Sequence, residues 1–146
     1  MGKGRIIGGY VAAVLATLVA ASLVHTHFTL HGLRALGAVI PAADAWALAR
    51  GDLAGLGPAF GAVIALALLV GFLVAGLVRR FLPWPRPLAY GLGGGAALLT
   101  ALWLMHWSFE ITPIGSARSW AGLLSLGLAG ALGGVIFALI SRPRTA

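Results

Sequence analysis

Residues 58–80 read PAFGAVIALALLVGFLVAGLVRR, and this stretch decides the fold class of the chain. From Pro58 to Val78 it holds no charged side chain, and Arg79 and Arg80 then end it. An α-helix of this length extends about 30 Å, which is the thickness of the hydrocarbon core of a bilayer. Peptide groups in hydrocarbon find partners only within their own helix. We therefore predict a transmembrane helix over residues 58–78.

Three further stretches have the same character, at about residues 6–24, 87–107 and 118–140. Hydrophobic residues make up 60% of the 146-residue chain and charged residues 9%, which excludes a soluble domain with one membrane anchor. The chain has no cysteine, which excludes disulfides and thiolate metal sites. The predicted fold is an all-α integral membrane protein, in which residues 1–146 form a single domain built as a four-transmembrane-helix bundle.

The charged residues predict the orientation of the chain. The net charge is +7. With the N-terminus in the cytoplasm, the following basic residues lie inside: Lys3, Arg5, Arg79, Arg80, Arg86, Arg142 and Arg144. The residues left outside are Arg34, Arg50, Arg118 and the three acids Asp44, Asp52 and Glu110. Because basic residues gather on the cytoplasmic side, we expect a multi-pass protein of the bacterial inner membrane with both termini in the cytoplasm. The basic excess then contacts the lipid bilayer and not nucleic acid.

The outer segment between the first two spans, residues 25–57, is too apolar for a solvated loop. Its first part is amphipathic, because two sets of side chains fall on opposite helical sides. These sets are Leu30, Leu33, Leu36 and Ile40 against His27, His31 and Arg34. Pro41 is expected to end this helix, and Asp44 and Asp52 are expected to cap the helical pieces that follow. We predict short interfacial helices here, with a re-entrant hairpin as the alternative.

Small residues at helical spacing predict how the spans pack. Lipid gives helices no hydrophobic reason to associate, so rows of small residues that allow close approach are the main packing signal. The chain has 22 glycines, and the candidate rows are Gly91 and Gly95, Gly127, Gly130 and Gly134, and Ala12, Ala16 and Ala20. These rows pack either within one bundle or between chains, and the last span is the best candidate for an intermolecular face.

A candidate ligand or cofactor cluster lies at the end of the third span. Trp103, His106, Trp107 and Glu110 share one helical face, and Arg118 can pair with Glu110 across the following loop. An aromatic wall with one imidazole and one carboxylate suits a quinone head, a cation or a proton in transit. The alternative is an interfacial anchor with a loop-closing ion pair.

The histidines of the outer segment form a candidate metal or haem site. His27 and His31 are four residues apart, which places two imidazoles on one helical face. His25 or His106 is a candidate third ligand, and Asp44 or Asp52 could complete the set. The alternative is that these side chains simply face water.

The predicted function follows from what the spans lack. No span carries a charge near its middle, where driven transporters usually place one. The chain also shows no catalytic motif, so we expect a non-enzymatic protein. It would act by assembly, either as an accessory subunit of a larger membrane complex or by self-association. One alternative is a binder of a hydrophobic cofactor, such as a quinone or haem, at the outer face. Another is a passive channel or a transporter-like protein. The sequence itself requires no cofactor.

Overall fold

The structure, a computed structural model, describes residues 2–109 and 119–142, apart from the side chains of Leu56, Ser108 and Phe109. Four helices make up most of these residues: α1 (Lys3–Ala35), α2 (Ala42–Phe81), α3 (Arg86–Phe109) and α4 (Trp120–Ile140). Each contains a stretch that is long and apolar enough to cross a membrane. The prediction of an all-helical chain with four candidate spans is confirmed, and these spans indicate a membrane protein.

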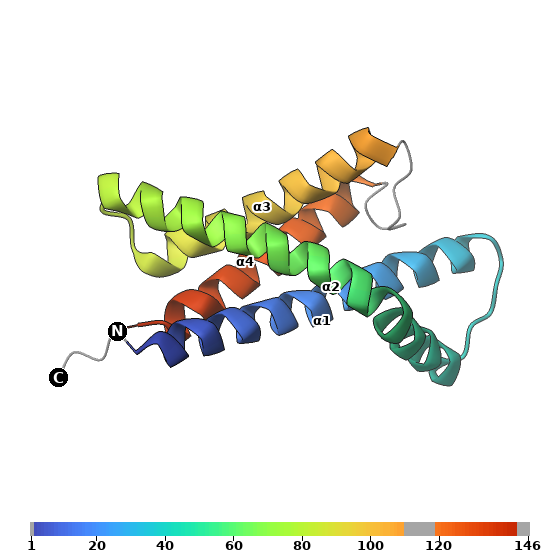
Figure 1. Cartoon of the computed structure of the whole chain (residues 1–146). Helices are drawn as coiled ribbons and strands as arrows, with labels where there is room; N and C mark the ends of the chain where they lie inside the picture. Colours follow the sequence, from blue (N-terminus) through green and yellow to red (C-terminus); the bar gives the residue numbers. More distant parts are fainter. Residues whose placement is uncertain (1, 110–118, 143–146) are drawn as a thin grey trace.

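The four helices form a ring in which each helix packs against two others (Figure 1). Helix α1 contacts α2 and α4, and α3 also contacts α2 and α4, whereas the backbones of α2 and α4 come close to each other at few points across the ring. The start of α1, the α2–α3 connection and the end of α4 lie at one end of this ring. Helices α1 and α2 continue at the other end into the connection between them. Consecutive helices therefore run in opposite directions, as in an up-down-up-down bundle.

Helices α3 and α4 approach each other until their backbones touch. A Cβ atom added at Gly94 would collide with the carbonyl oxygen of Gly130, and one added at Gly134 would collide with the carbonyl oxygen of Tyr90. A Cβ at Gly95 would lie 3.0 Å from the oxygen of Gly127. The glycine rows of these two helices are therefore in contact within one chain. Glycine is required at such positions because any side chain would hold the two backbones apart.

Helix α1 packs on another side of α4 through its own row of small residues. The buried residues of this row are Gly9, Ala13, Thr17 and Ala21, each four positions after the last. Thr17 fills the space left by Gly133 of α4. The expected row Ala12, Ala16 and Ala20 lies beside this one and is half-buried. Both rows are small, so the helical period did not distinguish them.

Helix α2 joins the ring through α3 and through a group of aromatic rings. A Cβ at Gly71 would lie 2.6 Å from the oxygen of Gly93, so α2 and α3 are also in close contact. Phe72 stacks on Phe137 of α4 with ring centroids 4.5 Å apart. The hydroxyl of Tyr10 donates a hydrogen bond of 2.6 Å to the carbonyl oxygen of Ala65, which ties α1 to α2.

The outer segment differs from the prediction. It does not form separate short helices, because α1 continues without a break to Ala35 and α2 already begins at Ala42. We call residues 25–35 of α1 and 42–57 of α2 the arms. They extend away from the rest of the bundle and do not fold back between the spans (Figure 1). Pro58 does not begin a helix but lies inside α2, and the first part of α2 runs at an angle to the rest of the helix (Figure 1). A proline lacks the amide hydrogen for one helical hydrogen bond, so it bends the helix without ending it.

Gly37, and not Pro41, ends α1. Its φ of 87° is in the left-handed region that glycine adopts readily. The Gly37 amide donates to the oxygen of Arg34, and the Ala38 amide donates to the oxygen of Leu33. This pair of hydrogen bonds is a Schellman motif, which satisfies carbonyl groups that the end of a helix leaves free. Pro41 instead precedes the first residue of α2, where Asp44 lies in the first turn without acting as the cap.

The contact between α3 and α4 predicts which glycines the fold requires. We expect Gly134→Ala to lower the free energy of unfolding by about 1–3 kcal/mol, the usual cost of overpacking, because the new methyl group meets backbone and cannot be accommodated by a side-chain rotation. Gly8→Ala is the matched control, since this exposed helical glycine has nothing near its Cβ position. Thermal unfolding in detergent measures both. Equal melting temperatures for the two variants would contradict the assignment.

Candidate functional site

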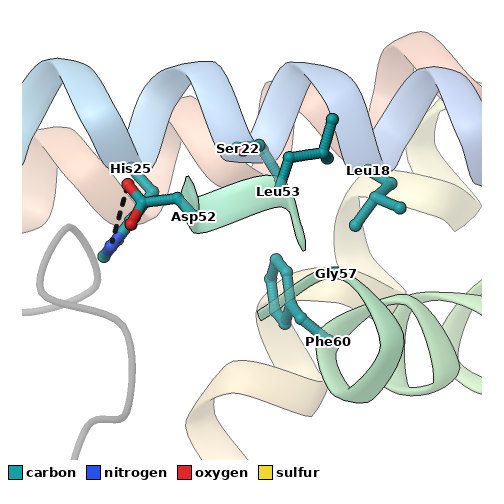
Figure 2. Close-up of a pocket in the computed structure, with 8 residues that line it drawn as sticks. Leu18, Ser22, His25, Asp52, Leu53, Gly57 and Phe60 are labelled. Atoms are coloured by element: carbon teal, nitrogen blue, oxygen red, sulfur yellow. Dashed lines mark ion pairs between the residues drawn. The ribbon is translucent and has the colours of Figure 1, made fainter. Parts of the chain in front are cut away.

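Three polar side chains converge where the arms leave the bundle. The Thr26 hydroxyl of α1 donates a hydrogen bond of 3.2 Å to Oδ2 of Asp52 on α2. His25 Nε2 lies 4.0 Å from the same oxygen (Figure 2). The side chains of His25 and Asp52 are only 15% and 21% exposed. We call these three residues the polar clasp, because they join the two arms at their base.

A small pocket lies beside the polar clasp, between α1 and α2 (Figure 2). Its remaining walls are largely apolar and consist of Leu18, Ala21, Ser22, Leu53, Gly57 and Phe60. The cavity volume is about 20 Å³, enough for one water molecule. His25 Nδ1 is shielded from solvent and has no hydrogen-bond partner among the described residues. In this conformation the pocket can hold one water or a group of similar size, but no larger ligand.

A larger hollow, which we call the arm groove, lies between the arms beyond the polar clasp. Its volume is about 290 Å³, close to the lower limit for small-molecule sites. From α1 it is lined by Leu23, Thr26, His27, Leu30 and Arg34. From α2 it is lined by Ala42, Ala45, Trp46 and Ala49. The arm groove exists because the short side chains of Ala42, Ala45 and Ala49 on α2 leave a gap to the side chains of α1 on the opposite wall.

The arm groove combines an apolar bed with a positive charge. Within the described part of the chain, no carboxylate lies within ion-pairing distance of the Arg34 guanidinium. The His27 ring stands edge-on against Phe28, with centroids 5.7 Å apart. The Trp46 side chain is prominent at the surface, and the residue is 66% exposed. An apolar bed with a cation and an indole suits a molecule that has both a hydrophobic body and a polar head.

The predicted cluster at the end of α3 forms no enclosed site in the part of the chain that the structure describes. Trp103 and Trp107 are 67% and 76% exposed, and His106 is exposed beside them. Glu110 and Arg118 lie outside the described residues. These two tryptophans and the histidine still share one face of α3, which is the arrangement of an interfacial anchor.

The three histidines of the predicted metal site are separated in the structure. His25 belongs to the polar clasp, His27 lines the arm groove, and His31 is exposed. Across residues 2–109 and 119–142, no group of three or more histidine, aspartate or glutamate side chains could hold a metal ion. The described residues therefore offer no metal centre.

Sequence reasoning missed the arm groove and the direct pairing of Thr26 with Asp52. One signal was present, because Ala42, Ala45 and Ala49 recur at helical spacing, but Ala43, Ala47, Gly51 and Gly55 do so as well. Recognising it required knowing that the two arms lie side by side. Comparisons of the chain with protein-family models, with curated proteins and with solved structures found no match.

The polar clasp predicts how the arms are held. Asp52→Leu removes the acceptor for Thr26 and the partner of His25, which together stabilise the arm contact by about 1–3 kcal/mol. We therefore expect the arms to separate. Because the chain has no cysteine, spin labels can be placed on His31→Cys and Ala47→Cys, both at exposed positions. Double electron–electron resonance should then show a longer and broader distance distribution.

Asp44→Leu is the control for this measurement, because Asp44 is exposed on the same arm and its side chain makes no described contact with α1. It should leave the distribution unchanged. Identical distributions for Asp52→Leu and the parent chain would show that the polar clasp does not hold the arms.

Proposed function

We propose that this chain is a non-enzymatic membrane protein that binds a hydrophobic small molecule with a polar head in the arm groove. The observation that carries the proposal is the arm groove itself, where an apolar bed ends at polar side chains. The body of the bundle offers much less room. Ile64, Leu68, Leu98 and Leu126 are fully buried within it, and the glycine contacts draw the helices together. This filled interior also argues against passive conduction.

Assembly with other membrane subunits, or self-association, has less support. That proposal depends on rows of small residues being free to contact another chain. The rows of α3 and α4 instead contact each other, and Gly133 of α4 contacts α1. The outward face of α4 carries large side chains such as Leu124 and Leu128, which suit lipid as well as protein. Binding at the arms therefore has the stronger structural basis.

The distribution of charge supports an outward orientation of the arms in a bacterial inner membrane. One end of the bundle carries Lys3, Arg5, Arg79, Arg80, Arg86 and Arg142. The arms carry Arg34 and Arg50 together with Asp44 and Asp52. Since basic residues favour the cytoplasmic side, we place both termini there. The arm groove then opens at the outer face, level with or beyond the lipid headgroups.

Filling the arm groove tests the binding proposal. We expect the double variant Ala45→Leu/Ala49→Leu to lose the bound molecule, because two larger side chains occupy its bed. The matched control is Ala43→Leu/Ala47→Leu, which makes the same changes at exposed positions of the same helix outside the groove. Each protein is purified from native membranes in mild detergent. Bound molecules are identified by native mass spectrometry, with absorption spectra and lipid extraction to detect haem or quinone.

A parent protein that retains no small molecule would refute this function. Retention of the same molecule by the Ala45→Leu/Ala49→Leu variant would place the binding site elsewhere. Loss in both double variants would point to general disruption of the arm, and the proposal would then lack its specific support.

The orientation is tested separately by labelling in spheroplasts. A membrane-impermeant maleimide should label His31→Cys in intact spheroplasts, because this position lies on an arm. It should label Trp84→Cys, in the α2–α3 connection, only after the membrane is permeabilised. The reverse pattern would place the arms in the cytoplasm.

A further inference from the structure

We infer that the arm groove binds an anionic phospholipid of the surrounding membrane, with the phosphate at Arg34 and an acyl chain along the alanine side of the groove. This inference rests on the proposed function and specifies the class of ligand.

The charges around the arm groove select an anion. Arg34 is the one permanently charged residue among those that line it. Asp52 is turned into the polar clasp, where Oδ2 accepts from Thr26 and lies near His25. Asp44 does not line the groove. The Arg34 guanidinium therefore has no described carboxylate to neutralise it, and its planar set of donors matches the oxygens of a phosphate group.

The shape of the arm groove selects a ligand with a long apolar part. Leu23 lies at the end nearest the span, and Arg34 lies at the far end, roughly 16 Å further along the axis of α1. Between them, Leu30 faces the alanines of α2. A free phosphate would leave this apolar bed in contact with water. An acyl chain covers it, and the chain can enter from the bilayer at the Leu23 end without crossing water.

A second copy of this chain fits the arm groove less well. An occupying helix would need an acid to meet Arg34. The acids of the chain are Asp52, which is held in the polar clasp, Asp44, which lies in the first turn of α2 beside the groove itself, and Glu110, which lies outside the described residues. A lipid phosphate can pair with Arg34 without any acidic residue of this chain.

The test measures which lipid the protein retains. The full chain is reconstituted in nanodiscs of equal parts phosphatidylglycerol and phosphatidylcholine, and native mass spectrometry then records the lipids that remain bound on release. We expect the parent protein to prefer phosphatidylglycerol about tenfold, because the choline cation of phosphatidylcholine offsets the phosphate charge that would pair with Arg34. Arg34→Gln should lower this ratio to near one while phosphatidylcholine still binds, because the apolar bed is intact. Arg50→Gln should keep the preference, since Arg50 is exposed on the α2 arm outside the groove.

The outcomes separate this inference from the proposed function. An unchanged preference in Arg34→Gln, or no preference in the parent protein, overturns the inference. The proposed function still stands in that case if Ala45→Leu/Ala49→Leu releases the bound molecule. A parent protein that retains no lipid or other small molecule refutes both. A dimer that dissociates on Arg34→Gln would identify a second copy as the occupant and would also overturn the inference.

Discussion

The structure depends on direct backbone contact between α3 and α4. In a bilayer, apolar side chains gain nothing by leaving lipid for one another, so helices associate where their surfaces can come unusually close. Gly94, Gly130 and Gly134 permit that approach. Helix α4 uses a neighbouring glycine, Gly133, to hold α1 as well. Helix α4 is therefore in close contact with both α3 and α1. Helix α2 is held by its own close contact with α3 and by the stacking of Phe72 on Phe137. Leu124, Leu128 and Leu132 of α4 are left on its outward face.

The interior of the bundle is filled by apolar side chains, and the polar clasp and the arm groove lie on the arms. Helices α1 and α2 have 33 and 40 residues, whereas about 20 residues cross the hydrocarbon core. The excess projects beyond the bundle at one end. Small residues act differently there. Gly94, Gly130 and Gly134 in the bundle are covered by a neighbouring backbone, but Ala42, Ala45 and Ala49 face α1 across an unfilled space. The same preference for small side chains thus produces tight contact in one region and a groove in the other.

The polar clasp and Pro58 lie close together in the chain, and this proximity links the arms to the bundle. Asp52 lies on the arm side of Pro58, and the pocket beside the polar clasp is lined by Gly57 and Phe60 on either side of that proline. Because Pro58 has no amide hydrogen to donate, the helix is least constrained at this point. A change in the angle of the α2 arm would therefore alter the polar clasp and the width of the arm groove together.

Composition and helical period predicted the four candidate spans, the sorting of charge between two ends and the glycine rows of the last two helices. Each depends on local composition or helical period, as residues 58–78 show. Contacts that depend on neighbouring helices were not predicted: Ala13 and Thr17 lie against Gly133 of α4 and are buried, whereas Ala12 and Ala16 are half-buried, and Asp52 accepts a hydrogen bond from Thr26. A helical period indicates which residues share a face, but it does not indicate what lies opposite. Helix ends were predicted less well, because a proline such as Pro58 can bend a helix that its neighbours hold in place.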